Sequence, residues 1–199
     1  MFTRLLSMLG VIAMAGLAPV GAKAATLDIT GGLTELTVTA PLGDLGIGAA
    51  AFGTATFDGT TFGFPITGGQ AFSDGNAFIE HDGVGVVLIA GTQAATVGNF
   101  QIDTATSTIL GNVNGGTGFA PLFDLGPAGD MGIEVKISST LGGALASVFA
   151  SADLPDLSGA TLGFATTAPT VSEVPLPAAA WMLLVGLGGL FAMKRRKAA

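Results

Sequence analysis

Residues 82–90 read Asp-Gly-Val-Gly-Val-Val-Leu-Ile-Ala, a turn signal followed by a run that is apolar except for one glycine. Short apolar runs rich in β-branched residues are typical of strands. We therefore expect residues 84–90 to form a central strand that is buried on both faces. The Asp82-Gly83 pair predicts a hairpin turn before this strand, because both residue types tolerate positive φ.

The flanking sequence indicates further strands and tight turns. Residues 34–39 alternate, with Leu36 and Val38 on one face, and residues 133–137 alternate apolar side chains with Glu134 and Lys136. Such alternation is typical of strands buried on one face. Asp-Gly pairs at 58–59 and 74–75, and a turn around 104–106, predict hairpins.

One segment has a helical period instead of alternation. Residues 140–152 place five side chains on one helical face: Leu141, Leu145, Val148, Phe149 and Ala152. Residues 158–166 then predict a last strand. The expected fold is mostly β, an antiparallel β-sandwich with one short helix, flanked by an N-terminal signal-peptide helix and a C-terminal transmembrane helix.

The N-terminus has the parts of a secretory signal peptide. Arg4 precedes an apolar run at 5–18, and Ala22-Lys23-Ala24 supplies an A-x-A cleavage site. We expect residues 1–24 to be a signal peptide, recognised by the secretion machinery and cut by signal peptidase after Ala24. The alternative is a second membrane helix, against which Pro19 and Gly21 interrupt the run.

The C-terminus has three parts in order. The motif Val174-Pro175-Leu176-Pro177-Ala178 precedes an uncharged apolar run to Met193, and the basic cluster Lys194-Arg195-Arg196-Lys197 follows. Counted from Val174 the stretch is long enough for a marginal membrane span. Basic residues stay on the cytoplasmic side, so we expect everything before Val174 to lie outside. A plain C-terminal anchor with a proline-rich stalk is one interpretation of this tail.

The tail also resembles the PEP-CTERM sorting signals of Gram-negative bacteria, most nearly their VPLPA-CTERM form. The resemblance covers the motif at 174–178, the length of the apolar run and the basic cluster at 194–197. It implies processing by an exosortase, an integral-membrane cysteine transpeptidase that cuts near the motif. The precursor would stand in the inner membrane with its C-terminus in the cytoplasm. The mature chain would then reach the cell surface or the exopolysaccharide matrix.

Charge and cysteine content limit the possible functions of the region between the two ends. All 14 acidic residues lie between Asp28 and Glu173, where Lys136 is the one basic residue, leaving a formal charge of −13. Such a surface repels nucleic acid and anionic membranes. The chain has no cysteine and therefore no disulfide framework. We expect one acidic secreted β-domain at 25–166, and a linker at 167–173.

Catalytic and metal motifs are sparse in the sequence. His81, the single histidine, is either a metal ligand or general base, or a polar residue at a strand end beside a turn. One histidine without cysteine does not make a usual zinc site. The acidic turns could offer oxygen ligands to Ca²⁺, but no D-x-[DN]-x-[DN]-G loop is present. Without a G-x-S-x-G motif or a phosphate-binding loop, we expect no enzyme, no catalytic residues and no metal or cofactor.

The body is similar, more loosely, to the haem-transport-associated (HtaA-like) extracellular β-domains. The matching parts are residues 62–69, 80–85 and 99–103, and the late helix followed by residues 159–166. This resemblance implies a β-sandwich with a helical segment, and haem bound through a tyrosine. The chain has no tyrosine, so that ligand cannot carry over.

These observations predict an exported protein with a structural or adhesive role at the cell surface or in an extracellular polysaccharide. The alternative is a secreted binding module for a small apolar or haem-like ligand, and a hydrolase is the third interpretation. A buried pocket of a few hundred Å³ with converging polar groups would favour the binding module, whereas a filled core would favour the structural role.

Overall fold

The computed structural model describes residues 26–152 and 154–172. The predicted signal peptide, with Ala22 and Ala24, and the predicted sorting signal at 174–197 lie outside these residues. Within them the chain forms eleven strands and one helix. In chain order the elements are β1 (Leu27–Val38), β2 (Ile47–Phe52), β3 (Thr56–Phe57), β4 (Thr61–Pro65), β5 (Gly68–Ala71), β6 (Ala77–Ala90), β7 (Gln93–Asp103), β8 (Thr108–Val113), β9 (Ala120–Gly129), β10 (Gly132–Ile137), α1 (Ser139–Val148) and β11 (Thr161–Val171).

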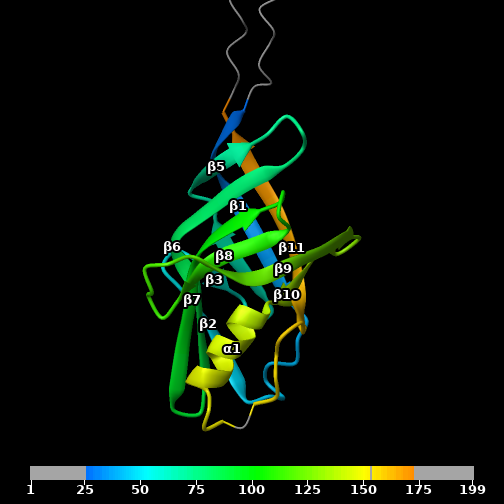
Figure 1. The fold of residues 1–199 in the computed structure, drawn as a ribbon. Coiled ribbons are helices and arrows are strands. Elements are labelled where there is room, and N and C mark those ends of the chain that lie inside the picture. The colour runs from blue at the N-terminus through cyan, green and yellow to red at the C-terminus, as the bar shows by residue number, and fades with distance from the viewer. Residues whose placement is uncertain (1–25, 153, 173–199) are drawn as a thin grey trace, which may run out of the picture.

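The strands form one antiparallel sheet that closes on itself through β1. From β6 to β11 each strand pairs with the next, and β11 then pairs with β1 from Ile29↔Val171 to Val38↔Gly163. The other edge of β1 pairs with β4 and β5, and β5 leads back to β6. Figure 1 shows β1 and β11, from opposite ends of the described chain, lying side by side. The mostly β, antiparallel fold with one short helix is thus confirmed.

The predicted β-sandwich takes the form of one continuous sheet. Hydrogen bonds join all eleven strands into one sheet, so opposite walls of the same sheet face each other across the core as the two layers of a sandwich would. The physical reason is that β1 has strand partners on both edges. A sheet closed in this way leaves fewer unpaired edges than an open one.

The core consists of the inward side chains of the sheet and one face of α1. Val135 and Ile137 are buried while Lys136 and Glu134 form an ion pair at 3.2 Å nearer the surface, as their alternation predicts. The predicted helix is confirmed, but it ends at Val148 rather than at residue 152. Leu141, Leu145 and the C-cap residue Phe149 are all at most 2% exposed. Ser138 caps its N-terminus by accepting a hydrogen bond from the backbone N–H of Leu141 at 3.1 Å. With ten residues, α1 is too short to cross a bilayer, and it is the one helix in this part of the chain.

The prediction for Asp82-Gly83 was wrong: the pair lies inside β6 rather than in a hairpin turn. The β6–β7 register shifts between His81 and Gly85, and Gly83 has φ 72°. Strand residues three apart face opposite sides, yet His81 and Val84 are both 1% exposed. The bulge at Asp82-Gly83 makes this possible by inserting extra residues between them. The hairpins at Asp58-Gly59, Asp74-Gly75 and 104–106 are confirmed, because each lies between paired consecutive strands.

Two other predictions also need correction. Residues 84–90 are not buried on both faces, because Ile89 is 44% exposed while Val86 and Leu88 pack on the core. Residues 167–171 are not a linker but the second half of β11, because the first half of β1 supplies their backbone partners. The β-domain therefore continues past residue 166 as far as the described chain runs.

Candidate functional site

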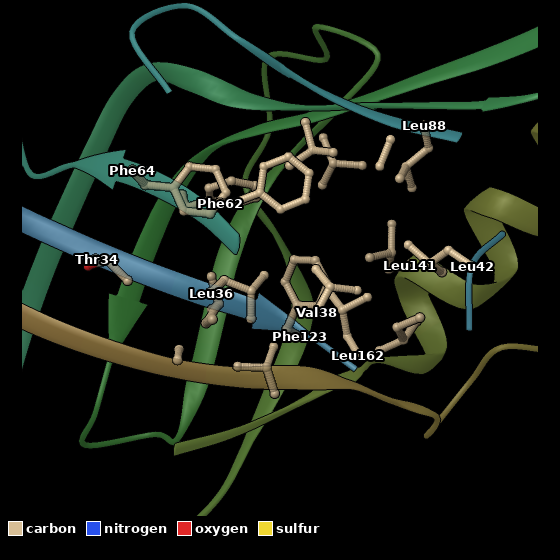
Figure 2. Close-up of a pocket in the computed structure, with 18 of the residues that line it drawn as sticks. Thr34, Leu36, Val38, Leu42, Phe62, Phe64, Leu88, Phe123, Leu141 and Leu162 are labelled. Atoms are coloured by element: carbon tan, nitrogen blue, oxygen red, sulfur yellow. The ribbon is translucent and has the colours of Figure 1, made fainter. Parts of the chain in front are cut away.

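The interior of the closed sheet holds a cavity of about 80 Å³. Its walls are almost entirely apolar and come from β1, β2, β4, β6 to β8, β9 to β11 and α1. Figure 2 shows Leu36 and Val38 of β1, Phe62 of β4 and Leu141 of α1 facing this space from different sides. The polar side chains on its wall are those of His81 and Thr34.

The size of the cavity limits what it can hold. Pockets for small molecules and cofactors usually measure about 300–1,000 Å³. An engineered apolar cavity of about 150 Å³ binds benzene, so a space of about 80 Å³ is smaller than one that takes a single aromatic ring. A haem-sized group therefore does not fit without displacing core side chains.

A row of aromatic rings fills much of the core beside the cavity. Phe57 stacks on Phe62 at 4.0 Å between ring centroids, and Phe62 on Phe64 at 5.8 Å. Phe64 then meets Phe100 edge to face at 5.3 Å. These rings contact one another as core residues do, and Phe62, Phe64 and Phe100 also form part of the cavity wall.

His81 lies at the edge of this aromatic row. It projects inward from β6, next to Phe64 at 6.4 Å between ring centroids, and it is 1% exposed. Its Nε2 shares a hydrogen bond with the Thr34 hydroxyl at 2.9 Å, and that hydroxyl contacts the Thr167 hydroxyl at 3.0 Å. The other ring nitrogen, Nδ1, has no hydrogen bond of good geometry. The prediction of a polar residue at a strand end beside a turn was therefore wrong, because His81 is a core residue.

Burial determines the charge state of His81. Removal from water lowers the pKa of His81 from 6.5 to about 4, against smaller opposing effects of the Phe100 backbone carbonyl and the Asp82 carboxylate. The imidazole is therefore neutral at pH 7. A neutral imidazole beside a hydroxyl has the geometry of a base and a nucleophile. However, no third side chain among the described residues orients Nδ1, and the cavity wall is apolar.

The carboxylates in two acidic turns accept hydrogen bonds from the backbone of their own turn. Asp58 accepts hydrogen bonds from the backbone N–H groups of Thr60 at 2.9 Å and Thr61 at 2.7 Å, and these bonds lower its pKa. Asp74 does the same with Asn76 at 2.9 Å, with the same effect on its pKa. Across residues 26–152 and 154–172, no three His, Asp or Glu side chains come together as a group that could hold a metal ion.

Sequence reasoning missed the hydrogen-bond partners of His81. Thr34 has the same alternation phase as Leu36 and Val38, so its inward position could have been inferred from the pattern. Thr167 was assigned to a linker, and only its pairing with Thr34 across β1 and β11 brings it to the site. The other predicted site residues, Val174–Ala178 and Lys194–Lys197, lie beyond the part of the chain that the structure describes.

Comparison with known proteins adds no assignment: no family model matches the chain, and no curated protein or solved structure is similar to it.

Proposed function

We propose that this chain is an exported protein with a structural or adhesive role. Its signal peptide directs it across the inner membrane, and its tail, from Val174 to Lys197, holds the precursor there until an exosortase cuts near 174–178. The body then acts at the cell surface or within an extracellular polysaccharide. The order of motif, apolar run and basic cluster supports the sorting step.

One structural observation carries the proposed role. The interior of the closed sheet is filled by its own side chains apart from about 80 Å³ of apolar space. A protein that carries a cofactor or drug-sized ligand needs several times that volume. A filled core in a sheet with few free edges is what a stable extracellular module without disulfides requires, because packing and backbone pairing must supply its stability.

The end of β11 adds a geometric detail to the sorting step. The backbone N–H of Ser172 still donates to the Asp28 carbonyl at 2.8 Å, so strand-like pairing continues to that residue. Only Glu173 then separates Ser172 from Val174. Strand pairing in the described chain therefore reaches to within one residue of the sorting motif, which on this proposal places the body close to the membrane surface until cleavage.

The alternative is a binding module for a very small apolar ligand. The observation that favours it is the cavity itself, a space of about 80 Å³ with an apolar wall inside the closed sheet, because side chains around an empty space lose packing contacts that a small apolar molecule would restore. Native mass spectrometry of the protein taken from its own cells distinguishes the two roles. A stoichiometric bound molecule would favour the binding module, and a mass equal to that of the polypeptide favours the structural role.

The sorting step is tested by replacing both Pro175 and Pro177 with alanine. Proline disfavours helix in the residues before it, so the double variant should let helix extend outward and block cleavage. Precursor should then accumulate in the membrane fraction, as measured by immunoblot and intact mass. Pro155→Ala, at an exposed position in the body, is the matched control and should be processed normally. Normal release of the double variant would refute the exosortase step.

A further inference from the structure

A second hollow, of about 210 Å³, is lined by residues of the sheet. It lies on the outer face, because Val86 and Val97, next to Gly85 and Gly98 in their strands, face the interior cavity. Its lining residues come from β2, β7, β8 and the turn after β8: Phe52, Thr96, Gly98, Asn99, Asn112 and Gly115. None of these side chains is charged. The hollow is therefore a neutral site on a strongly acidic protein, and it is separate from the interior cavity.

The strand register explains why the sheet is hollowed there. Phe52 pairs with Gly85, Gly85 with Gly98, and Gly98 with Asn112, so the four residues form one row across β2, β6, β7 and β8. A Cβ atom at Gly85 would lie 2.5 Å from the Phe52 ring, and one at Gly98 would lie 2.7 Å from it. The ring thus lies over two positions without side chains, and it forms one wall of the hollow.

Asn112, at the other end of the row, carries an unsatisfied polar atom. The side chain is 9% exposed, and its Nδ2 donates to the Gly116 carbonyl. This bond fixes the orientation of the amide, because a carbonyl can only accept. The Oδ1 atom is left buried without a partner. A buried acceptor without a hydrogen bond costs on the order of 1–3 kcal/mol, and because the atom has almost no accessible surface, a ligand reaches it only if the Asn112 side chain turns toward the hollow.

Two more polar side chains line the same hollow. Asn99 has φ 52°, and its Oδ1 accepts from the backbone N–H of Gly83 at 2.8 Å, which leaves its NH₂ group as a donor. Thr96, held by backbone and side-chain bonds to Asn114, adds a hydroxyl that can donate or accept. The hollow therefore combines one aromatic wall with the amide of Asn99 and the hydroxyl of Thr96, and the buried Oδ1 of Asn112 lies beside them.

We infer that this hollow binds a neutral hexose unit of a polysaccharide. A pyranose has an apolar C–H face that fits against an aromatic ring, and it carries hydroxyl groups that can accept from the amide of Asn99 and bond to the hydroxyl of Thr96. The formal charge of −13 between Asp28 and Glu173 repels anionic glycans. This inference rests on the proposed function, because it supplies the contact through which an exported module would adhere to a polysaccharide.

Affinity electrophoresis of the full chain tests the inference. The protein is run in a polyoxyethylene detergent, which has no sugar head group, through native gels that contain dextran, mannan, galactan or the anionic polymer alginate. We expect retardation by at least one neutral polymer. Phe52→Ala should weaken that retardation by about tenfold or more, as for loss of a central aromatic contact. Thr96→Val, which keeps the side-chain shape, should weaken it several-fold.

Phe72→Ala is the matched control, because Phe72 is an exposed phenylalanine (40%) in the β5–β6 turn away from the hollow. It should leave the retardation unchanged. If circular dichroism shows that Phe52→Ala does not fold, the retardation of Thr96→Val alone tests whether the hollow binds the polymer. Three results would overturn the inference: no retardation by any neutral polymer, retardation by alginate alone, or wild-type retardation of both hollow variants. A chain that is exported and cleaved but binds no glycan overturns this inference alone, whereas failed processing overturns the sorting step alone.

Discussion

Acidification should destabilise this protein through His81. The side chain is 1% exposed and its folded-state pKa is lowered by burial from 6.5 to about 4. The unfolded chain therefore takes up a proton on His81 below about pH 6.5, whereas the folded chain does not until about pH 4. Stability from this group is fully present above pH 6.5 and is lost as the pH falls toward 4.

The size of the effect follows from these two pKa values. With a pKa of 6.5 in the unfolded chain and about 4 in the folded chain, proton linkage predicts that the free energy of unfolding falls by about 2 kcal/mol from pH 7 to pH 5. Titrating carboxylates also change stability over this range, so the comparison must be made against a variant that lacks the imidazole. His81→Gln keeps an amide that can bond to Thr34 and does not titrate.

Two measurements check this prediction on the full chain. Because the sequence contains one histidine, the imidazole ¹³Cε1 resonance in an NMR titration belongs to His81 without further assignment. It should show a midpoint well below 6. Urea unfolding followed by circular dichroism at pH 7 and pH 5 should show that the wild type loses about 2 kcal/mol more than His81→Gln. An NMR midpoint between 6 and 7, or equal losses in the two proteins, would refute the argument from burial.

Two other predictions follow from the packing of α1 and from the charge. Gly142→Ala should lower the free energy of unfolding by about 1–3 kcal/mol, because the new Cβ would lie 2.3 Å from Ser158 Oγ. Gly143→Ala should raise it by about 0.5–1 kcal/mol, because a Cβ there meets nothing within 4 Å. Equal urea midpoints for the two variants would contradict this. Added NaCl should raise the melting temperature by screening the repulsion between carboxylates. Ca²⁺ at matched ionic strength should not raise it further, because the Asp58 and Asp74 carboxylates accept hydrogen bonds from their own turns. A larger shift with Ca²⁺ than with Mg²⁺ would contradict this and indicate a calcium site.

The strands and the helix were largely predictable because their signals are local. The alternation at 133–137 and the helical period at 140–152 predicted β10 and α1, and two of the three Asp-Gly pairs marked true hairpins. The third pair has the same composition and lies in a bulge. The third pair differs because His81 and Val84, on either side of it, both face the core. That arrangement depends on how β6 pairs with β7 and cannot be read from the turn residues.

The candidate sites were less predictable, because each depends on residues far apart in the chain. His81 could be singled out as the lone histidine, but its burial and its contact with Thr34 arise from the closure of the sheet through β1. Nothing in the sequence pointed to the outer hollow. It exists because Phe52, Gly85, Gly98 and Asn112 come into one row across four strands.

The sequence alone determined the periods, the turn residues, the acidic charge and the motifs of the two ends, because each is a property of neighbouring residues. Only the tertiary structure decided that the sheet closes, that residues 167–171 extend β11, and which polar atoms are left without partners. The physical reason is that register and burial are set by hydrogen bonds between strands distant in the chain. A change of one residue in register moves every side chain of a strand to the opposite face.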